Sequence, residues 1–134
     1  MEQYTVAIIK WNVVKAVDIS KYGFKVDYEI RAHVKDLEWW AEFYSEHKGK
    51  DYFESLVKYM ATGTCHFMIL THSQGDPIKR WRDAIGPTNA AMTKEPPTCL
   101  RAIYGDDESL RTNGFHGSDS TQAAEREAKL IKQL

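Results

Sequence analysis

Near the end of the chain stands the stretch Asn113-Gly114-Phe115-His116-Gly117-Ser118-Asp119-Ser120. It places one histidine among glycines and hydroxyl-bearing residues, directly before a segment with the apolar spacing of a helix. A nucleophilic imidazole needs a neutral ring, space for the incoming group and donors that hold the oxygens of that group. If Asp119, Ser120 or a neighbour caps the helix, the free N–H groups of its first turn face the histidine. The alternative is an ordinary strand-turn-helix joint with a surface histidine, and spacing alone does not exclude it.

This stretch resembles the active-site signature of the nucleoside diphosphate kinases, in which the histidine is phosphorylated and passes the phosphoryl group on. The resemblance covers nearly the whole chain, through residues 43–47, 52–60, 62–63, 81–89, 100–105 and 124–127. Residues 86–88 (Gly-Pro-Thr) and 101–105 (Arg-Ala-Ile-Tyr-Gly) are more similar to the divergent branch of that family. The resemblance implies one domain over residues 1–134, an α/β (α+β) sandwich. The fold is ferredoxin-like, with a four-stranded antiparallel sheet covered by helices.

The composition is typical of a soluble globular domain. Hydrophobic residues make up 43% and charged residues 28% of the 134 residues. The net charge of -1 argues against a broad basic face, so we expect no specific nucleic-acid partner. Cys65 and Cys99 are the only cysteines, as in cytoplasmic proteins with reduced thiols. We expect neither secretion nor a membrane partner, because there is no signal-peptide pattern and no apolar run of about 18 to 20 residues.

Three segments of the chain have strand patterns. Residues 4–9 and 65–71 predict buried strands, because they are rich in β-branched and apolar side chains. Residues 24–34 alternate with period two, which predicts a half-buried strand. Its apolar side holds Phe24, Val26, Tyr28, Ile30 and Ala32. Two helical segments separate this strand from the one at 65–71, which favours a right-handed crossover.

Four further segments have helical spacing. The first spans 36–47, capped by Asp36, and its apolar face holds Leu37, Trp40, Ala41 and Tyr44. The second spans 52–60. The third spans 78–85, with Asp76 as its cap and Pro77 in its first turn. The last spans 121 to about 133, with Ala124, Ala128 and Ile131 on one face.

The resemblance implies a catalytic centre at His116, with Ser118 and Glu127 supporting the ring. A carboxylate that accepts from one ring nitrogen leaves the other free as nucleophile. Glu127 lies eleven positions after His116, about three turns at 3.6 residues each, so spacing alone does not place the carboxylate beside the ring. Lys10, at the end of the first strand, would contact the ribose and the transferred phosphate. The alternatives are a solvated glutamate and a solvated lysine.

The resemblance also implies a nucleotide pocket. The phosphates would be held by Arg82, Thr88 and Arg101, since arginine binds phosphate bidentately. The base would stack on Tyr52 beside Leu56, with Leu110 as the opposite wall. Asn113 would hold the sugar hydroxyl, and Tyr44 would approach the transferred phosphate. The alternative for the arginines is surface pairing with nearby carboxylates, and for Tyr52 it is packing within a helix.

Mg²⁺ is the implied cofactor. It would be held chiefly by nucleotide phosphates and water, with Asp119 as the nearest candidate carboxylate. The partners are then nucleoside tri- and diphosphates. The family also implies a homo-oligomer, in which Trp39 and Trp40, expected to be exposed, lie at an interface. Dimer, tetramer and hexamer stay open.

Two departures from the family pattern leave two hypotheses for the function. About seven residues of the first helix are missing after Lys10, and the chain stops without the tail that members commonly carry. The first hypothesis is an active nucleoside diphosphate kinase. The alternative is a catalytically weak nucleotide-binding or protein-interaction domain of the same fold. Retention of His116 together with its supporting residues favours the first.

Overall fold

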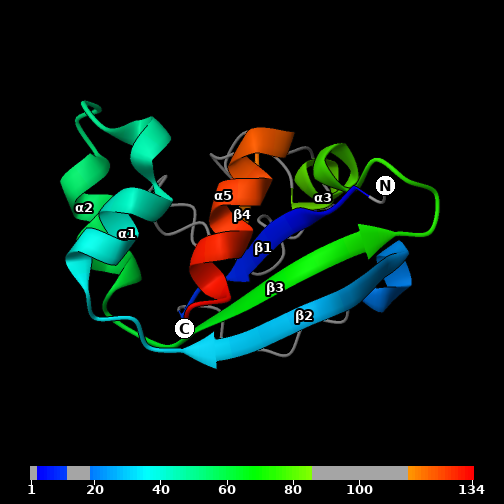
Figure 1. Cartoon of the computed structure of the whole chain (residues 1–134), viewed down its shortest axis with the longest axis horizontal. Helices are drawn as coiled ribbons and strands as arrows, with labels where there is room; N and C mark the ends of the chain where they lie inside the picture. Colours follow the sequence, from blue (N-terminus) through cyan, green and yellow to red (C-terminus); the bar gives the residue numbers. More distant parts are fainter. Residues whose placement is uncertain (1–2, 12–18, 86–114) are drawn as a thin grey trace, which may run out of the picture.

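The architecture is a single antiparallel sheet with helices on both faces, seen in a computed structural model that describes residues 3–11, 19–85 and 115–134. The strands in these residues are β1 (Thr5–Ile9), β2 (Phe24–Ala32), β3 (Cys65–His72) and β4 (Phe115–Gly117). They form a four-stranded sheet in the order β2-β3-β1-β4, and every neighbouring pair is antiparallel. Figure 1 shows β3 and β1 in the middle of this sheet. The ferredoxin-like fold expected from the sequence is confirmed.

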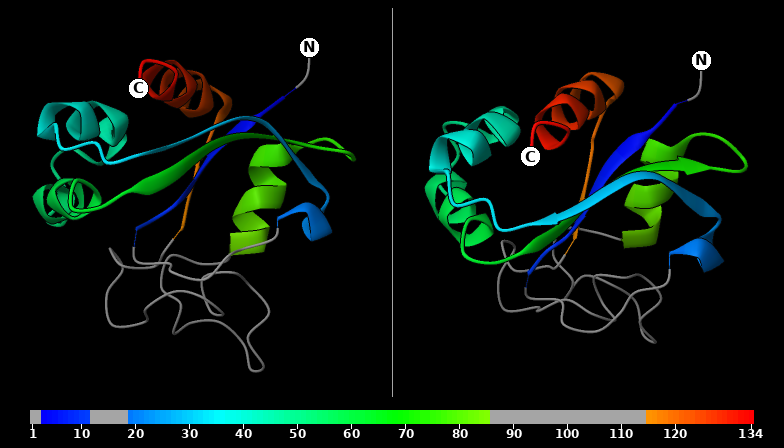
Figure 2. Two further views of the ribbon diagram at one scale, coloured as in Figure 1. Left: turned by 90° about the horizontal axis from the view of Figure 1, so that it is seen from below. Right: turned by 60° about the horizontal axis from the view of Figure 1, so that its bottom comes forward.

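The sheet divides the hydrophobic core into two layers, and helices cover each of its faces. One face carries α1 (Leu37–Phe43), α2 (Phe53–Met60) and α5 (Thr121–Ile131), and the other carries α3 (Pro77–Ile85), as the edge-on view of Figure 2 shows. Ile8 and Phe67 belong to the core cluster under the first set of helices. Ala7 and Met68 belong to the cluster under α3. Successive side chains of β1 and β3 point to opposite faces, so each of these strands contributes residues to both core layers.

The register of β2 differs from the simple alternation that the sequence predicts. Val26 pairs with Leu70 but Tyr28 pairs with Ile69, so Asp27 is an extra residue on this strand. Such a bulge reverses the side to which the following side chains point. Val26 accordingly packs on the α3 side, whereas Tyr28 packs on the opposite face. The prediction that all five apolar residues of this strand share one side is wrong for that reason.

The segment between β2 and β3 is a helical insertion and not a crossover. Ala32 pairs with Cys65, so the segment leaves and rejoins the sheet at neighbouring positions of antiparallel strands. A crossover joins parallel strands, and the predicted one is therefore wrong. The insertion holds α1, a short 3-10 helix η2 (Ser45–His47) and α2. A second 3-10 helix, η1 (Ser20–Tyr22), precedes β2.

The first helix of this insertion is shorter than its predicted range of 36–47. Asp36 caps it as predicted, because its carboxylate accepts the N–H groups of Glu38 and Trp39 at 2.9 and 3.4 Å. Leu37, predicted to lie on the apolar face, is 45% exposed. Trp40 and Tyr44 are buried as predicted, and Phe43, three positions after Trp40, completes the buried stripe.

Trp40 is a core residue. Its side chain is fully buried, and its indole N–H donates to the carbonyl oxygen of Val34 at 2.7 Å. Trp39 is partly buried, and its ring stacks on Phe43 with 5.4 Å between centroids. The prediction that both tryptophans are exposed at an interface is therefore wrong for Trp40. Its ring can be buried without cost to the polar N–H, because that group donates to a carbonyl oxygen inside the core.

The other three predicted helices agree with the structure apart from their ends. α2 begins at Phe53, one residue after its predicted start. α3 begins at Pro77, and Asp76 at its N-cap position has φ of 51° and accepts the N–H of Arg80 with its main-chain carbonyl. α5 ends at Ile131, short of the predicted 133. None of the helices in the described parts of the chain is long and apolar enough to cross a membrane.

Candidate active site

His116 lies on the edge strand β4 and is paired with a carboxylate from α5. Its Nε2 is 2.8 Å from Oε1 of Glu127, and Oγ of Ser118 donates to the same oxygen at 2.9 Å. The exposed fraction is 9% for His116 and 0% for both Ser118 and Glu127. The fold thus brings together the three residues that the sequence resemblance grouped.

The hydrogen bonds assign the tautomer of the His116 ring. An ionised carboxylate accepts only, so Nε2 carries the proton and donates it to Glu127. Nδ1 is then the ring nitrogen with the lone pair. Ser118 is fixed as well, because its Oγ accepts the N–H of Val6 at 3.0 Å while its own proton goes to Glu127. In the neutral form of the ring this arrangement leaves Nδ1 as the unprotonated nitrogen, as a nucleophile requires.

Two features of α5, its N-terminal cap and its face of small residues, position Glu127 beside the sheet. Ser120 begins α5, and its Oγ accepts the N–H of Ala123 at 3.1 Å, which fulfils the predicted cap. Ala124 and Ala128 are buried on the inward face, and such small side chains let a helix approach closely. Glu127 lies among these buried positions. The fold therefore returns the carboxylate to the histidine, which helical spacing does not predict.

The main chain of His116 is held from the other face of the sheet. The indole N–H of Trp81 in α3 donates to the carbonyl oxygen of His116 at 2.8 Å. Gly117 makes this possible, because a Cβ there would lie 2.5 Å from Cδ1 of Trp81. The side chain of the histidine is thus oriented by α5 and its backbone by α3.

Aromatic residues from α1 and the following turn flank the imidazole. The ring of Phe43 lies 5.1 Å from that of His116, and the ring of Tyr44 lies 5.5 Å away in a T-shaped contact. Tyr44 in turn lies 5.8 Å from the ring of His47, whose Nδ1 is hydrogen-bonded to the hydroxyl of Tyr52 at 2.7 Å. Of the two tyrosines predicted to contact the nucleotide, Tyr44 therefore contacts His116 directly, and Tyr52 is connected to it through His47 and Tyr44.

His47 is a residue that the sequence prediction missed. Burial lowers the pKa of its imidazole, while the charge of Glu46 raises it and that of His116 lowers it. Its position three residues after Tyr44 was the available signal, because residues at that spacing share a helical face. A titratable group with a shifted pKa beside a candidate nucleophile is a typical component of a functional site.

Lys10 and Leu56 lie on the same face of the sheet as His116. Lys10 follows β1 and is 4% exposed, and by alternation it shares its side with Ile8, the β1 partner of His116. Its charge lowers the pKa of the Cys65 thiol, although burial dominates and raises that pKa to about 11. Leu56 is buried in the core cluster of α1, α2 and α5.

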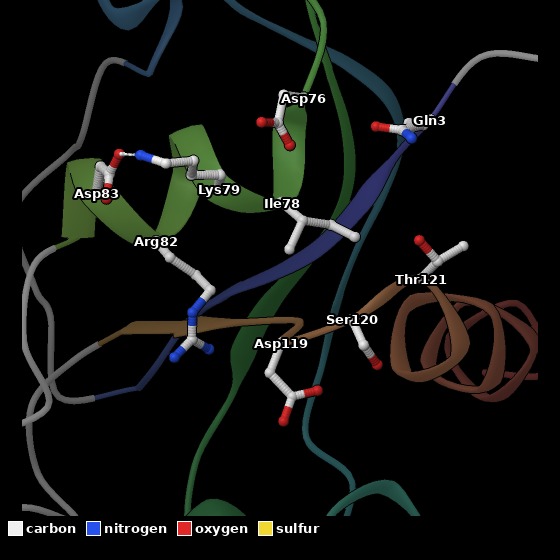
Figure 3. A pocket seen from close by; sticks show the side chains of 9 residues that line it. All are labelled: Gln3, Asp76, Ile78, Lys79, Arg82, Asp83, Asp119, Ser120 and Thr121. Atoms are coloured by element: carbon white, nitrogen blue, oxygen red, sulfur yellow. Dashed lines mark hydrogen bonds and ion pairs between the residues drawn. The ribbon is translucent and has the colours of Figure 1, made fainter.

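Arg82 and Asp119 line an open pocket of about 430 Å³ between α3 and the start of α5. Figure 3 shows both side chains extending toward the same part of this pocket, Arg82 from α3 and Asp119 from the joint between β4 and α5. Its described lining does not include His116 or Lys10. The remaining predicted site residues, Thr88, Arg101, Leu110 and Asn113, lie outside the described residues.

The donor set around Asp119 suits a magnesium ion bound mainly by a substrate. Among the residues that the structure describes, no three His, Cys, Asp or Glu side chains come together as a metal site. Mg²⁺ usually keeps several waters and takes one or two carboxylates together with substrate phosphates. A single carboxylate such as Asp119, with a phosphate-binding cation such as Arg82 in the same pocket, fits that requirement.

Comparison with known proteins identifies the family. The family model described as nucleoside diphosphate kinase matches residues 3–133. The chain is 39% identical over 114 residues to probable nucleoside diphosphate kinase 5 of Arabidopsis thaliana, with 84% of this chain and 76% of the relative covered. It is 38% identical over 133 residues to nucleoside diphosphate kinase homolog 5 of Mus musculus, with 95% and 61% covered.

Solved structures agree with the sequence matches. The nucleoside diphosphate kinase of Aquifex aeolicus superposes with a TM-score of 0.83 at 28% identity, with 96% of this chain and 94% of that chain covered. The Halobacterium salinarum enzyme, solved in complex with CDP, gives 0.83 at 27% identity with 98% and 88% covered. The chain spans only 20% of the length of thioredoxin domain-containing protein 3 homolog of Ciona intestinalis, to which it is 39% identical over 138 residues, with 94% of this chain covered. The sequence, the fold and the paired histidine agree, and the chain belongs to the nucleoside diphosphate kinase family.

Proposed function

We propose that the chain is a nucleoside diphosphate kinase that works through a phosphohistidine at His116. The observation that carries the proposal is the buried pair of His116 and Glu127, in which Nε2 donates to the carboxylate and Nδ1 keeps its lone pair. Membership of the family supports the reaction class, and the histidine supplies the nucleophile.

In the first half of the reaction, Nδ1 of His116 attacks the γ-phosphorus of a nucleoside triphosphate. The N–P bond forms as the bond from the γ-phosphorus to the bridging oxygen breaks, and the nucleoside diphosphate leaves with that oxygen. Positive charge grows on the ring, and the carboxylate of Glu127, 2.8 Å from Nε2, offsets it. Because the Nε2 proton stays between ring and carboxylate, the step needs no external base.

In the second half, a terminal oxygen of an acceptor nucleoside diphosphate attacks the phosphorus. The N–P bond breaks, its electron pair returns to Nδ1, and the starting tautomer is restored. Donor and acceptor use the same pocket in turn, so catalysis depends mainly on positioning and on charge neutralisation. Ser118 keeps Glu127 in place through both halves.

The nucleotide is proposed to lie along the helical insertion. Tyr52 would carry the base beside Leu56, and stacking on a π face is tolerant of base type, so purines and pyrimidines are both expected to bind. Tyr44 and Lys10 would approach the transferred phosphate. The remaining phosphate and sugar contacts are assigned by resemblance to Arg82, Thr88, Arg101, Leu110 and Asn113.

Mg²⁺ would supply charge neutralisation to the phosphates, with Asp119 as its protein ligand. Arg82 would neutralise phosphate charge from the same pocket as Asp119. A homo-oligomer and a cytoplasmic location stay predictions. Sedimentation at several protein concentrations tests the first, and subcellular localisation of the tagged protein tests the second.

Intact-mass measurement after mixing the protein with GTP and Mg²⁺ tests the proposed function. We expect a gain of one phosphoryl group that is acid-labile, absent from a His116→Ala variant and discharged by CDP. No gain while GTP still binds would refute the catalytic proposal. The catalytically weak nucleotide-binding domain would then be the better account.

A further inference from the structure

Arg126 joins two parts of the chain that are distant in sequence. It precedes Glu127 on α5, and its Nη2 lies 3.7 Å from Oε2 of that carboxylate. The same nitrogen forms an ion pair with Oε2 of Glu46 in η2 and donates to the carbonyl oxygen of Phe43 at 3.4 Å. The guanidinium thus bridges α5 to the turn that follows α1.

The Glu127 end of this bridge is buried. Oε1 of Glu127 accepts from both His116 and Ser118. Oε2 is also buried, and within the described residues it has no hydrogen-bond partner. A buried carboxylate oxygen without a compensating partner is costly, so the nearby guanidinium is the group that offsets its charge.

The Glu46 end of the bridge holds the aromatic side of the site. Glu46 lies in η2 between Tyr44 and His47, and the rings of Phe43 and Tyr44 flank the imidazole of His116. One guanidinium therefore contacts both the carboxylate that orients the imidazole and the turn whose rings pack against it. Its side chain is 32% exposed and that of Glu46 is 26% exposed, so this pair is shielded in part from solvent screening.

We infer that Arg126 is a positioning residue that holds Glu127 and the η2 turn in the arrangement that keeps His116 in a single tautomer with Nδ1 as the free nitrogen. Its role in phosphoryl transfer rests on the proposed function. Its effect on the imidazole does not, because the tautomer is a property of the protein without nucleotide. The two claims can therefore fail separately.

Histidine-selective ¹⁵N labelling and NMR of the nucleotide-free protein test the positioning. We expect the two ring nitrogens of His116 to have the well-separated shifts of one protonated and one unprotonated nitrogen. In Arg126→Met, which keeps an apolar stem without the charge, the separation should shrink as the second tautomer becomes populated. Arg126→Lys should restore part of it. Lys129→Met, which removes an exposed cation from the same helix, should leave it unchanged.

Two results would overturn the inference. One is a wild-type imidazole spectrum in folded Arg126→Met, and the other is an equal change in Lys129→Met. Circular dichroism establishes that each variant is folded. If Arg126→Met does not fold, Arg126→Lys and Glu46→Gln carry the test, since the first weakens both ends of the bridge and the second weakens the Glu46 end alone. Unchanged spectra in both would refute the role.

Single-turnover phosphorylation by GTP and Mg²⁺ adds a kinetic test. A guanidinium that only stabilised the fold would leave the rate of the folded variants intact. We expect Arg126→Met to lower the rate at saturating GTP on the order of tenfold, because displacement of the reacting ring weakens positioning. Glu46→Gln should chiefly raise the GTP concentration at half-maximal rate. Wild-type protein that takes no phosphoryl group would refute the proposed function, while the NMR result would still decide the positioning role.

Discussion

Replacing Gly117 by alanine tests how closely α3 packs against β4. The added Cβ would lie 2.5 Å from Cδ1 and 3.1 Å from Nε1 of Trp81. Trp81 has no exposed surface, and its ring meets that of Phe24 edge-on at 5.4 Å. Because ordinary carbon contacts are about 3.5–4 Å, the indole has to move by roughly 1 Å within a close-packed layer.

The energetic effect has three parts. Overpacking of a core costs about 1–3 kcal/mol. If the indole N–H of Trp81 loses the carbonyl oxygen of His116, a buried donor is left unpaired at a further cost of about 1–3 kcal/mol. Alanine recovers about 0.4–1 kcal/mol by restricting the unfolded chain. The middle values of these ranges sum to a fall of about 3 kcal/mol in the free energy of unfolding.

Urea unfolding at fixed protein concentration, followed by tryptophan fluorescence, measures this change. With slopes of about 1–3 kcal/mol per molar urea, the midpoint should drop by about 1–3 M. Gly49→Ala is the matched control, because Gly49 has φ of 88° and open space around its Cβ position. It should lose only about 1 kcal/mol from backbone strain. A loss at Gly117 no larger than the control would refute the close-packing argument.

Three further predictions concern single side chains. Ser118→Ala should lower the free energy of unfolding by about 1–3 kcal/mol, because the N–H of Val6 loses its acceptor; an unchanged urea midpoint would contradict that bond. In a Cys99→Ser background, Cys65 should react with a thiol reagent at pH 8 far more slowly than in the unfolded chain, since burial raises its pKa to about 11. Equal rates would rule out the buried thiol. Burial also lowers the pKa of His47 in the folded protein. Between that lowered pKa and its ordinary value of 6.5 the unfolded state binds more protons, so the protein becomes less stable as the pH is lowered. His47→Gln should flatten that fall in urea titrations between pH 7 and 5, and an unaltered slope would show that His47 does not contribute.

The sequence predicted the strands and helices well because their patterns are local. Runs of β-branched and apolar residues located β1 and β3, period-two alternation located β2, and polar caps located the starts of α1 and α5. It failed at Asp27, where the register of β2 shifts. Nothing in the residue types there distinguishes a bulge from a regular strand, since the shift is set by pairing with β3.

The candidate site was predictable in the parts that lie close together in sequence. His116 and Ser118 belong to one short motif, whereas Glu127 required the family resemblance. Trp81 and Arg126 were missed, because each joins the site through packing between distant elements. His47 was missed although its spacing from Tyr44 was an available signal. Arg126, for example, contacts a carbonyl that is 83 positions away in the chain. Such contacts leave no periodic signal in a single sequence.

The pairing of Ala32 with Cys65 has a consequence for how such a protein can change. Residues 33–64 are flanked by Ala32 and Cys65, which pair directly with each other in β2 and β3. The length of this segment therefore places no constraint on the register of the sheet. Insertions or deletions there would alter the wall that carries Tyr44 and Tyr52 and leave the strand of His116 where it is. The sheet therefore tolerates a change of length in this insertion, and the contacts of Phe43, Tyr44 and Glu46 with His116 and Arg126 are what such a change would have to preserve.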